Sequence, residues 1–128
     1  MTVNLDEALN SFDELWSPRI VARINDYDVR VTKVRGEYVW HKHDTTDELF
    51  LVLDGELDIA LREEAGERVV RMRKGDVFVV PKGVVHRPSS EPGASIVVIE
   101  PEGNPTTGDG TTGIPDHLTT TTGQSYQG

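Results

Sequence analysis

The stretch His41-Lys42-His43-Asp44-Thr45-Thr46-Asp47-Glu48 decides how we interpret this chain. Successive side chains of a strand point to opposite faces, so His41 and His43 are predicted to share one face. A reversal through the intervening residues would bring Glu48 back beside both imidazoles, and His86 offers a fourth side chain far along the chain. Three imidazoles and one carboxylate that converge on a point suit a divalent transition metal. We therefore predict a metal site formed by these four residues.

The spacing around these residues resembles that of a known family. Gly36 precedes His41, Gly55 follows Glu48 by seven residues, and Gly75 precedes the run Pro81-x-Gly83-x-x-His86 by six. This pattern resembles the two-part motif of the cupins, with all four metal-ligand positions of that family filled. Gly36 lies one residue closer to the first histidine than usual, and Ser90 stands where the second motif often ends in asparagine. Neither position is a ligand position, so the departures concern loop shape.

The resemblance covers about residues 29–100, and two short runs extend it. His86-Arg87-Pro88 and Glu100-Pro101-Glu102-Gly103 are similar to sequences in small single-domain cupins of the RmlC-like superfamily. The resemblance implies an all-β fold, the antiparallel double-stranded β-helix or jelly-roll barrel, with a metal in it. It implies no particular reaction. It also implies a homodimer, because such cupins commonly pair through their sheets.

Composition excludes several classes of protein. The 128 residues suffice for one domain with one core. The formal charge of −9 argues against a nucleic-acid partner, because phosphate contacts need clustered Lys and Arg. There is no cysteine, which excludes thiolate ligands, and no apolar run approaches the roughly 20 residues of a membrane helix. The acidic residues 1–7 lack an apolar signal region, so we expect a cytoplasmic protein.

Periodicity predicts a short helix followed by strands. An apolar stripe predicts a helix over residues 4–15 with Asn4 as its N-cap. From residue 19 onward the period is two, and about nine short strands are predicted, including 38–43, 48–53, 56–62, 84–86 and 96–100. The dipeptide Asp54-Gly55 predicts a type I′ hairpin turn.

Regular alternation also predicts which side chains line the barrel. Val39, Phe50 and Val52 are expected beside the ligands. Tyr38 and Trp40 are expected on the face opposite the two histidines, where an exposed indole would need a cover, and this adds to the expectation of a homodimer.

We divide the chain into an N-terminal helix (1–18), a cupin barrel (19–103) and a Thr/Gly-rich tail (104–128). The tail has few apolar residues and cannot offset its own ordering entropy, so we expect it to be flexible or strapped across the barrel. His117 in this tail is expected to be a surface residue and not a ligand.

The predicted ligand set leaves three functions open. Four protein ligands on an octahedral ion (Fe, Mn, Ni, Zn, Co or Cu) leave two adjacent positions for water, substrate or dioxygen. The first function is a metal-dependent enzyme acting on a small anionic or enolate-forming organic substrate, as a dioxygenase or as a lyase or isomerase. The second is a non-catalytic metabolite-binding or regulatory cupin, and the third is a structural metal. We favour the enzyme because of the open positions, but the residue types identify no general acid or base.

Overall fold

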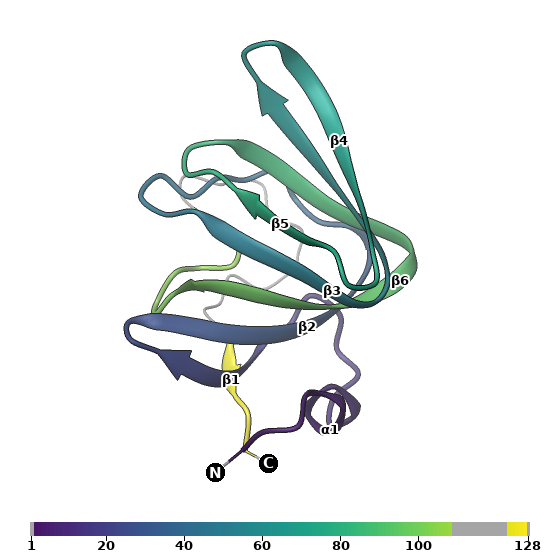
Figure 1. Cartoon of the computed structure of the whole chain (residues 1–128), viewed down its shortest axis with the longest axis vertical. Coiled ribbons are helices and arrows are strands. Elements are labelled where there is room, and N and C mark those ends of the chain that lie inside the picture. Colours follow the sequence, from purple (N-terminus) through teal and green to yellow (C-terminus); the bar gives the residue numbers. More distant parts are fainter. Residues whose placement is uncertain (1, 109–122, 128) are drawn as a thin grey trace.

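The computed structural model describes residues 2–108 and 123–127. They form one short helix and seven strands (Figure 1). The elements are α1 (Leu5–Asn10), β1 (Arg19–Ile24), β2 (Tyr27–Glu37), β3 (Glu48–Glu63), β4 (Gly66–Arg73), β5 (Val77–Val80), β6 (Val85–Pro101) and β7 (Gln124–Ser125). The sheet order is β4-β3-β6-β2-β1-β7, and β5 also pairs with β3. Every pairing between these strands is antiparallel except the short one between β1 and β7, so the predicted all-β class with an N-terminal helix is confirmed.

The two longest strands, β3 and β6, close the barrel. The first half of β3 pairs with β5 and with the end of β6, and its second half pairs with β4 and with the beginning of β6. The register shifts near Asp54 and Gly55, where the sheet bends. Because each long strand takes part in both halves, the strands wind into the predicted double-stranded β-helix (Figure 1).

The predicted hairpin at Asp54-Gly55 is wrong. The chain does not reverse there, because Asp54 pairs with Ser95 and Gly55 with Ala94 inside one continuous strand. Gly55 does adopt a positive φ of 80°, but a Cβ built on it would lie 2.1 Å from the carbonyl oxygen of Gly93. The glycine therefore serves a close approach of β6 at a bend. In the same way, the strands expected at 84–86 and 96–100 are the two ends of β6.

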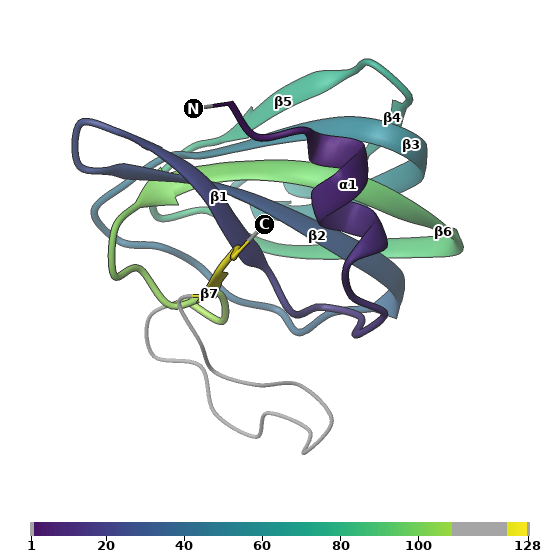
Figure 2. The same cartoon turned by 90° about the horizontal axis from the view of Figure 1, so that it is seen from below.

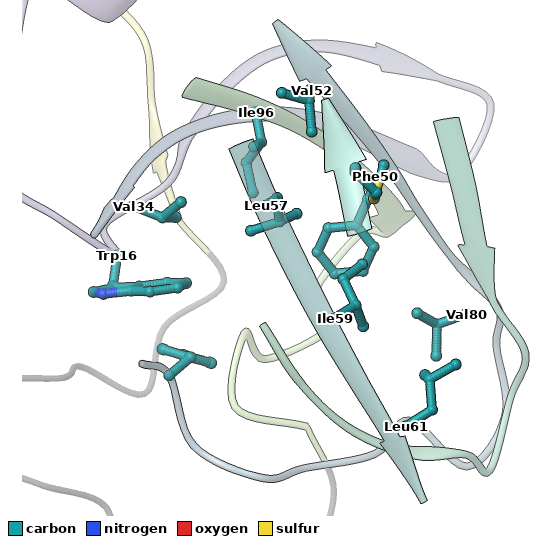
Figure 3. Packing of buried hydrophobic residues seen from close by; sticks show 11 residues of the cluster. Trp16, Val34, Phe50, Val52, Leu57, Ile59, Leu61, Val80 and Ile96 are labelled. Carbon is teal, nitrogen blue, oxygen red and sulfur yellow. The ribbon is translucent and has the colours of Figure 1, made fainter. Parts of the chain in front are cut away.

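Apolar side chains fill the barrel and also cover its outer face. The interior cluster includes Val34, Phe50, Val52, Leu57 and Ile96 (Figure 3). A second cluster lies outside, where Ala8, Leu9 and Phe12 pack against residues of β1, β2 and β6. Figure 2 shows α1 lying across this outer face of the sheet. The amphipathic stripe of the helix is thus covered by the barrel itself.

The helix is shorter than predicted. Asn4 caps it as expected, accepting a hydrogen bond from the Glu7 amide at 3.0 Å, but it ends at Asn10. A continued helix would place Phe12 and Trp16 on one face, four residues apart. Phe12 instead joins the outer cluster and Trp16 the inner one, so the chain must leave the helical path between them.

The ends of the predicted tail lie against the barrel. Residues 104–108 follow β6, and β7 pairs with β1. The rest of the segment expected to be flexible, including His117, lies outside the described residues. Across 2–108 and 123–127, no helix has the length and apolar character needed to cross a membrane.

Candidate metal centre

His41, His43, Glu48 and His86 meet inside the barrel. One ligand atom from each lies within 4.8 Å of the others. Glu48 begins β3, His86 lies on β6, and both other histidines lie on the segment between β2 and β3. All four are buried, with at most 4% of any of them exposed. The convergence that the sequence predicted is therefore present.

Backbone hydrogen bonds bring this segment to β6. The amide of His41 donates to the carbonyl of His86 at 3.0 Å, and the amide of His86 donates back at 2.8 Å. The amide of Gly83 donates to the carbonyl of His43 at 2.8 Å. The expected strand over 38–43 is otherwise absent, since only an isolated bridge at His41 remains of it.

The ring nitrogens of His41 and His86 are oriented by carbonyl groups. Nδ1 of His41 lies 2.9 Å from the carbonyl oxygen of Val39, and Nδ1 of His86 lies 2.9 Å from that of Val84. A carbonyl can only accept, so each Nδ1 carries a proton, and Nε2 is the nitrogen of each ring that faces the site. Such partners are the usual way in which proteins orient metal-binding imidazoles.

His43 provides the observation that fits a metal most directly. Its Nε2 is buried and has no hydrogen-bond partner, although Glu48 Oε1 lies 3.5 Å away. Glu48 Oε1 also lies 3.1 Å from Nε2 of His86. Burying a polar nitrogen without a partner costs on the order of 1–3 kcal/mol. A cation bound among these atoms would remove that cost, so the residues present fit a divalent metal.

The pKa values of Glu48 and His41 are shifted in the directions that suit metal ligands. Burial alone would raise the pKa of Glu48, but the imidazoles of His43 and His86, through close polar contact and charge, outweigh it and hold the pKa well below the usual range. Burial, reinforced by the neighbouring His86, lowers the pKa of His41 to about 4. In the metal-free protein at neutral pH, an ionised carboxylate therefore faces a neutral His41.

A small cavity adjoins the four residues. Its volume is about 50 Å³. His41 and Glu48 belong to its wall, together with the mainly apolar group Trp16, Tyr38, Phe50, Ile96 and Val98 and the polar residues Arg30, Thr32, Thr106 and Glu100. Phe50 faces the site as predicted. Val39 and Val52 are not in the cavity wall, and Val52 lies fully buried in the interior cluster.

Comparison with known proteins assigns the family. The family described as the cupin domain matches residues 29–100, more than half of the chain. This chain belongs to the cupin family.

Its relatives include proteins with and without a stated activity. YdbB of Bacillus subtilis (strain 168), named as uncharacterized, is 39% identical over 87 residues, 68% of this chain and 74% of YdbB. The crystal structure of a cupin-2 domain protein from Shewanella frigidimarina NCIMB 400 is 40% identical with a TM-score of 0.73, covering 77% of this chain and 93% of that one. The 3-hydroxyanthranilate 3,4-dioxygenase of Xanthomonas euvesicatoria pv. vesicatoria (strain 85-10) is 34% identical over 70 residues, 55% of this cupin and 40% of the dioxygenase.

The expected outward position of Tyr38 is wrong. Tyr38 is 7% exposed, stacks on Trp16 at a centroid distance of 4.7 Å and meets the ring of His41 edge-on at 5.4 Å. The two-residue alternation fails because residues 38–40 are not a regular strand. Trp40 is half-buried and lies against the guanidinium groups of Arg62 and Arg87, at 3.8 and 4.9 Å from their central carbons. Two arginines of the same chain thus cover the indole.

The sequence did not predict a buried charged network that lies beside His43. Arg30 donates to Glu100 Oε1 at 2.5 Å and to Asp28 Oδ2 at 3.0 Å, and all three residues are at most 1% exposed. Glu100 Oε2 lies 3.8 Å from Nε2 of His43. Burial, followed by the negative charge of Glu48, raises the pKa of Glu100 well above its usual value despite Arg30. Glu100 therefore keeps its proton to a higher pH than an exposed glutamate.

Asn104 was also not predicted from the sequence. Its Nδ2 lies 2.9 Å from Nδ1 of His43 and 3.0 Å from Glu100 Oε2. Nothing in the residue type or spacing marked it, because it follows the last long strand in a segment that composition predicts to be flexible. The pairing of β6 with β2 carries Glu100 to the site, and the turn after β6 carries Asn104 there.

Proposed function

We propose that this cupin holds one divalent transition metal (Fe, Mn, Ni, Zn, Co or Cu) through His41, His43, Glu48 and His86. We further propose that it acts on a small anionic or enolate-forming organic substrate as a metal-dependent dioxygenase, lyase or isomerase. The single observation that supports this most is the buried Nε2 of His43, which lacks a hydrogen-bond partner inside a cluster of three other potential ligand atoms.

The ion, when bound, supplies Lewis acidity and two adjacent open positions. The other contributions come from the chain. The carbonyls of Val39 and Val84 hold two imidazoles in the tautomer that leaves Nε2 available. The apolar wall of Trp16, Phe50 and Val98 limits the water beside the site.

Charge indicates the kind of ligand. A divalent ion with three neutral imidazoles and the Glu48 carboxylate leaves a net charge near +1. A ligand that offers two oxygens, as a carboxylate, an α-keto acid or an enediol does, matches both this charge and two adjacent positions. A neutral molecule with one donor atom matches neither.

The relative named 3-hydroxyanthranilate 3,4-dioxygenase supports the dioxygenase among these activities, since this chain is 34% identical to it over 70 residues. The alternative is a non-catalytic metabolite-binding or regulatory cupin. One observation favours it: the four side chains are nearly inaccessible and the adjoining cavity is small, which suits retention of a ligand.

Thermal unfolding tests the proposed ligand class. Oxalate or pyruvate should raise the unfolding temperature of protein loaded with Zn²⁺, because a ligand that binds only the folded state stabilises it. Acetamide, a neutral control, should have no such effect, and neither should oxalate on metal-free protein. Equal protection of the metal-free protein would show that recognition does not pass through the metal. With Fe²⁺-loaded protein, oxygen uptake on adding an enediol or o-aminophenol substrate would select the dioxygenase.

We also propose that the protein forms a homodimer and acts in the cytoplasm. The support for dimerisation has changed, because Tyr38 and the helix stripe are covered within one chain. What remains is the resemblance and the exposure of Val69, Val77 and Val79 on β4 and β5, at 42–58%.

A further inference from the structure

The amide of Asn104 lies between a proposed metal ligand and a buried carboxyl group. Its Nδ2 contacts Nδ1 of His43 at 2.9 Å and Oε2 of Glu100 at 3.0 Å. An amide nitrogen only donates, so in this arrangement Nδ1 of His43 is an acceptor. A neutral imidazole that accepts at Nδ1 carries its proton on Nε2. His43 therefore differs from His41 and His86, whose Nδ1 atoms face carbonyl oxygens.

This tautomer of His43 is incompatible with a metal at Nε2. A metal ligand needs the lone pair of Nε2, and the proton must then move to Nδ1. An Nδ1–H group needs an acceptor in the place where Nδ2 of Asn104 lies. A rotation of the side-chain amide by about 180° around the Cβ–Cγ bond exchanges its nitrogen and oxygen at nearly the same positions. Asn104 thus has the chemical form to serve either tautomer.

The backbone of Asn104 is held so that its amide stays beside His43. The backbone carbonyl of Asn104 accepts a hydrogen bond from Arg30 Nη1 at 3.0 Å, and the backbone N–H of Asn104 donates to the carbonyl of Pro101 at 3.1 Å. Two residues further on, Thr106 Oγ1 accepts a hydrogen bond from the hydroxyl of Tyr38 at 3.2 Å. A side chain on a backbone anchored in this way can rotate its amide without leaving the imidazole.

We propose that Asn104 is a positioning residue that selects the metal-binding tautomer of His43 by inverting its amide when the metal binds. This inference rests on the proposed metal centre. While Nε2 of His43 carries the proton, Nδ2 donates to Nδ1 of His43 and to Glu100. With a metal on Nε2, Oδ1 would accept from Nδ1–H of His43, and Oε2 of Glu100 would lose its amide donor. The amide therefore links the occupancy of the metal site to the hydrogen bonding of the second carboxyl group in the cavity.

The affinity for Zn²⁺, measured by competition with a chromophoric chelator, tests the role of the side chain. Asn104→Leu keeps similar bulk but offers no acceptor, and it should bind Zn²⁺ about 10–100-fold more weakly, the usual effect of losing the partner of a metal-binding imidazole. Asn10→Leu, the same substitution at an exposed position at the end of α1, is the control and should bind like the wild type. Equal affinities of wild type and Asn104→Leu would overturn the inference while leaving the metal centre intact. A wild type that binds no Zn²⁺ would overturn both.

A second measurement needs no variant. ¹⁵N NMR of the imidazoles distinguishes the two tautomers, and we expect His43 to carry its proton on Nε2 in the metal-free protein and on Nδ1 after Zn²⁺ is added. The side-chain NH₂ signals of Asn104 should shift on the same titration. A proton on Nδ1 of His43 in both states would overturn the inversion, even if Asn104→Leu weakens binding.

Discussion

Replacing Gly55 by alanine tests how β3 and β6 form the barrel. Gly55 and Gly36 have nearly the same φ, +80° and +81°, so alanine meets the same backbone strain at both positions, about 1–2 kcal/mol. Their surroundings differ. A Cβ on Gly36 would have nothing within 4 Å, whereas a Cβ on Gly55 would lie 2.1 Å from the carbonyl oxygen of Gly93 and 2.9 Å from Cα of Ala94.

These contacts involve backbone atoms of β6, which no side-chain rotation can relieve. The two strands must move apart where Gly55 pairs with Ala94, and overpacking of this kind costs about 1–3 kcal/mol or more. We therefore expect Gly55→Ala to lower the free energy of unfolding by about 2–5 kcal/mol and Gly36→Ala by about 1–2 kcal/mol.

Urea unfolding of the metal-free proteins, followed by circular dichroism, gives both values from the midpoints if the m-values agree. A hairpin turn at Asp54-Gly55 would leave Gly55 without these backbone contacts. Equal losses in the two variants would therefore refute the continuous β3.

Three further predictions concern the site and the surface. The pKa of His41 falls from 6.5 to about 4 on folding, so neutral His41 contributes about 3 kcal/mol to the free energy of unfolding above pH 6.5, and this contribution is lost as the pH falls towards 4. In urea unfolding of metal-free protein, the wild type should therefore lose more stability than His41→Asn between pH 7 and 4.5. Parallel pH profiles of the two proteins would contradict this. The comparison with a variant is needed because Glu100, with its raised pKa, acts in the opposite direction. The hydroxyl of Thr32 is buried without a hydrogen-bond partner, so Thr32→Val should leave the free energy of unfolding unchanged or raise it by up to about 1 kcal/mol. A clear loss of stability would mean that the hydroxyl makes a hydrogen bond. Light scattering at micromolar concentration should give the mass of a dimer, and a monomer mass would count against pairing.

The cluster of three histidines and one glutamate could be predicted from the sequence because the pattern that marks it is local and depends on residue type. His41 and His43 are two residues apart, Glu48 follows closely, and the spacing around His86 completes a motif that few other arrangements share. Where a local turn signal conflicted with the packing of distant strands, the packing determined the structure. Asp54-Gly55 has the composition of a hairpin turn, yet the approach of β6 uses the glycine at a bend.

The rest of the site depends on pairings that no local pattern reveals. Glu100 reaches His43 because β6 pairs with β2, which places it opposite Asp28 and beside Arg30. Asn104 reaches the same imidazole only because a turn follows that strand. Periodicity can say that residues share a face, but it cannot say which distant strand that face will meet.

Metal content is the most direct test of the central claim. Metal-free protein is incubated with Fe²⁺, Mn²⁺, Ni²⁺, Cu²⁺ or Zn²⁺ in turn, freed of unbound ion by gel filtration and analysed for metal per chain, beside His43→Ala. We expect about one equivalent in the wild type for at least one of these ions and far less in the variant, which should keep its strand framework by circular dichroism because the core does not depend on the ion. No retained metal in the wild type, or the same amount in a folded His43→Ala, would contradict a metal centre at these four residues.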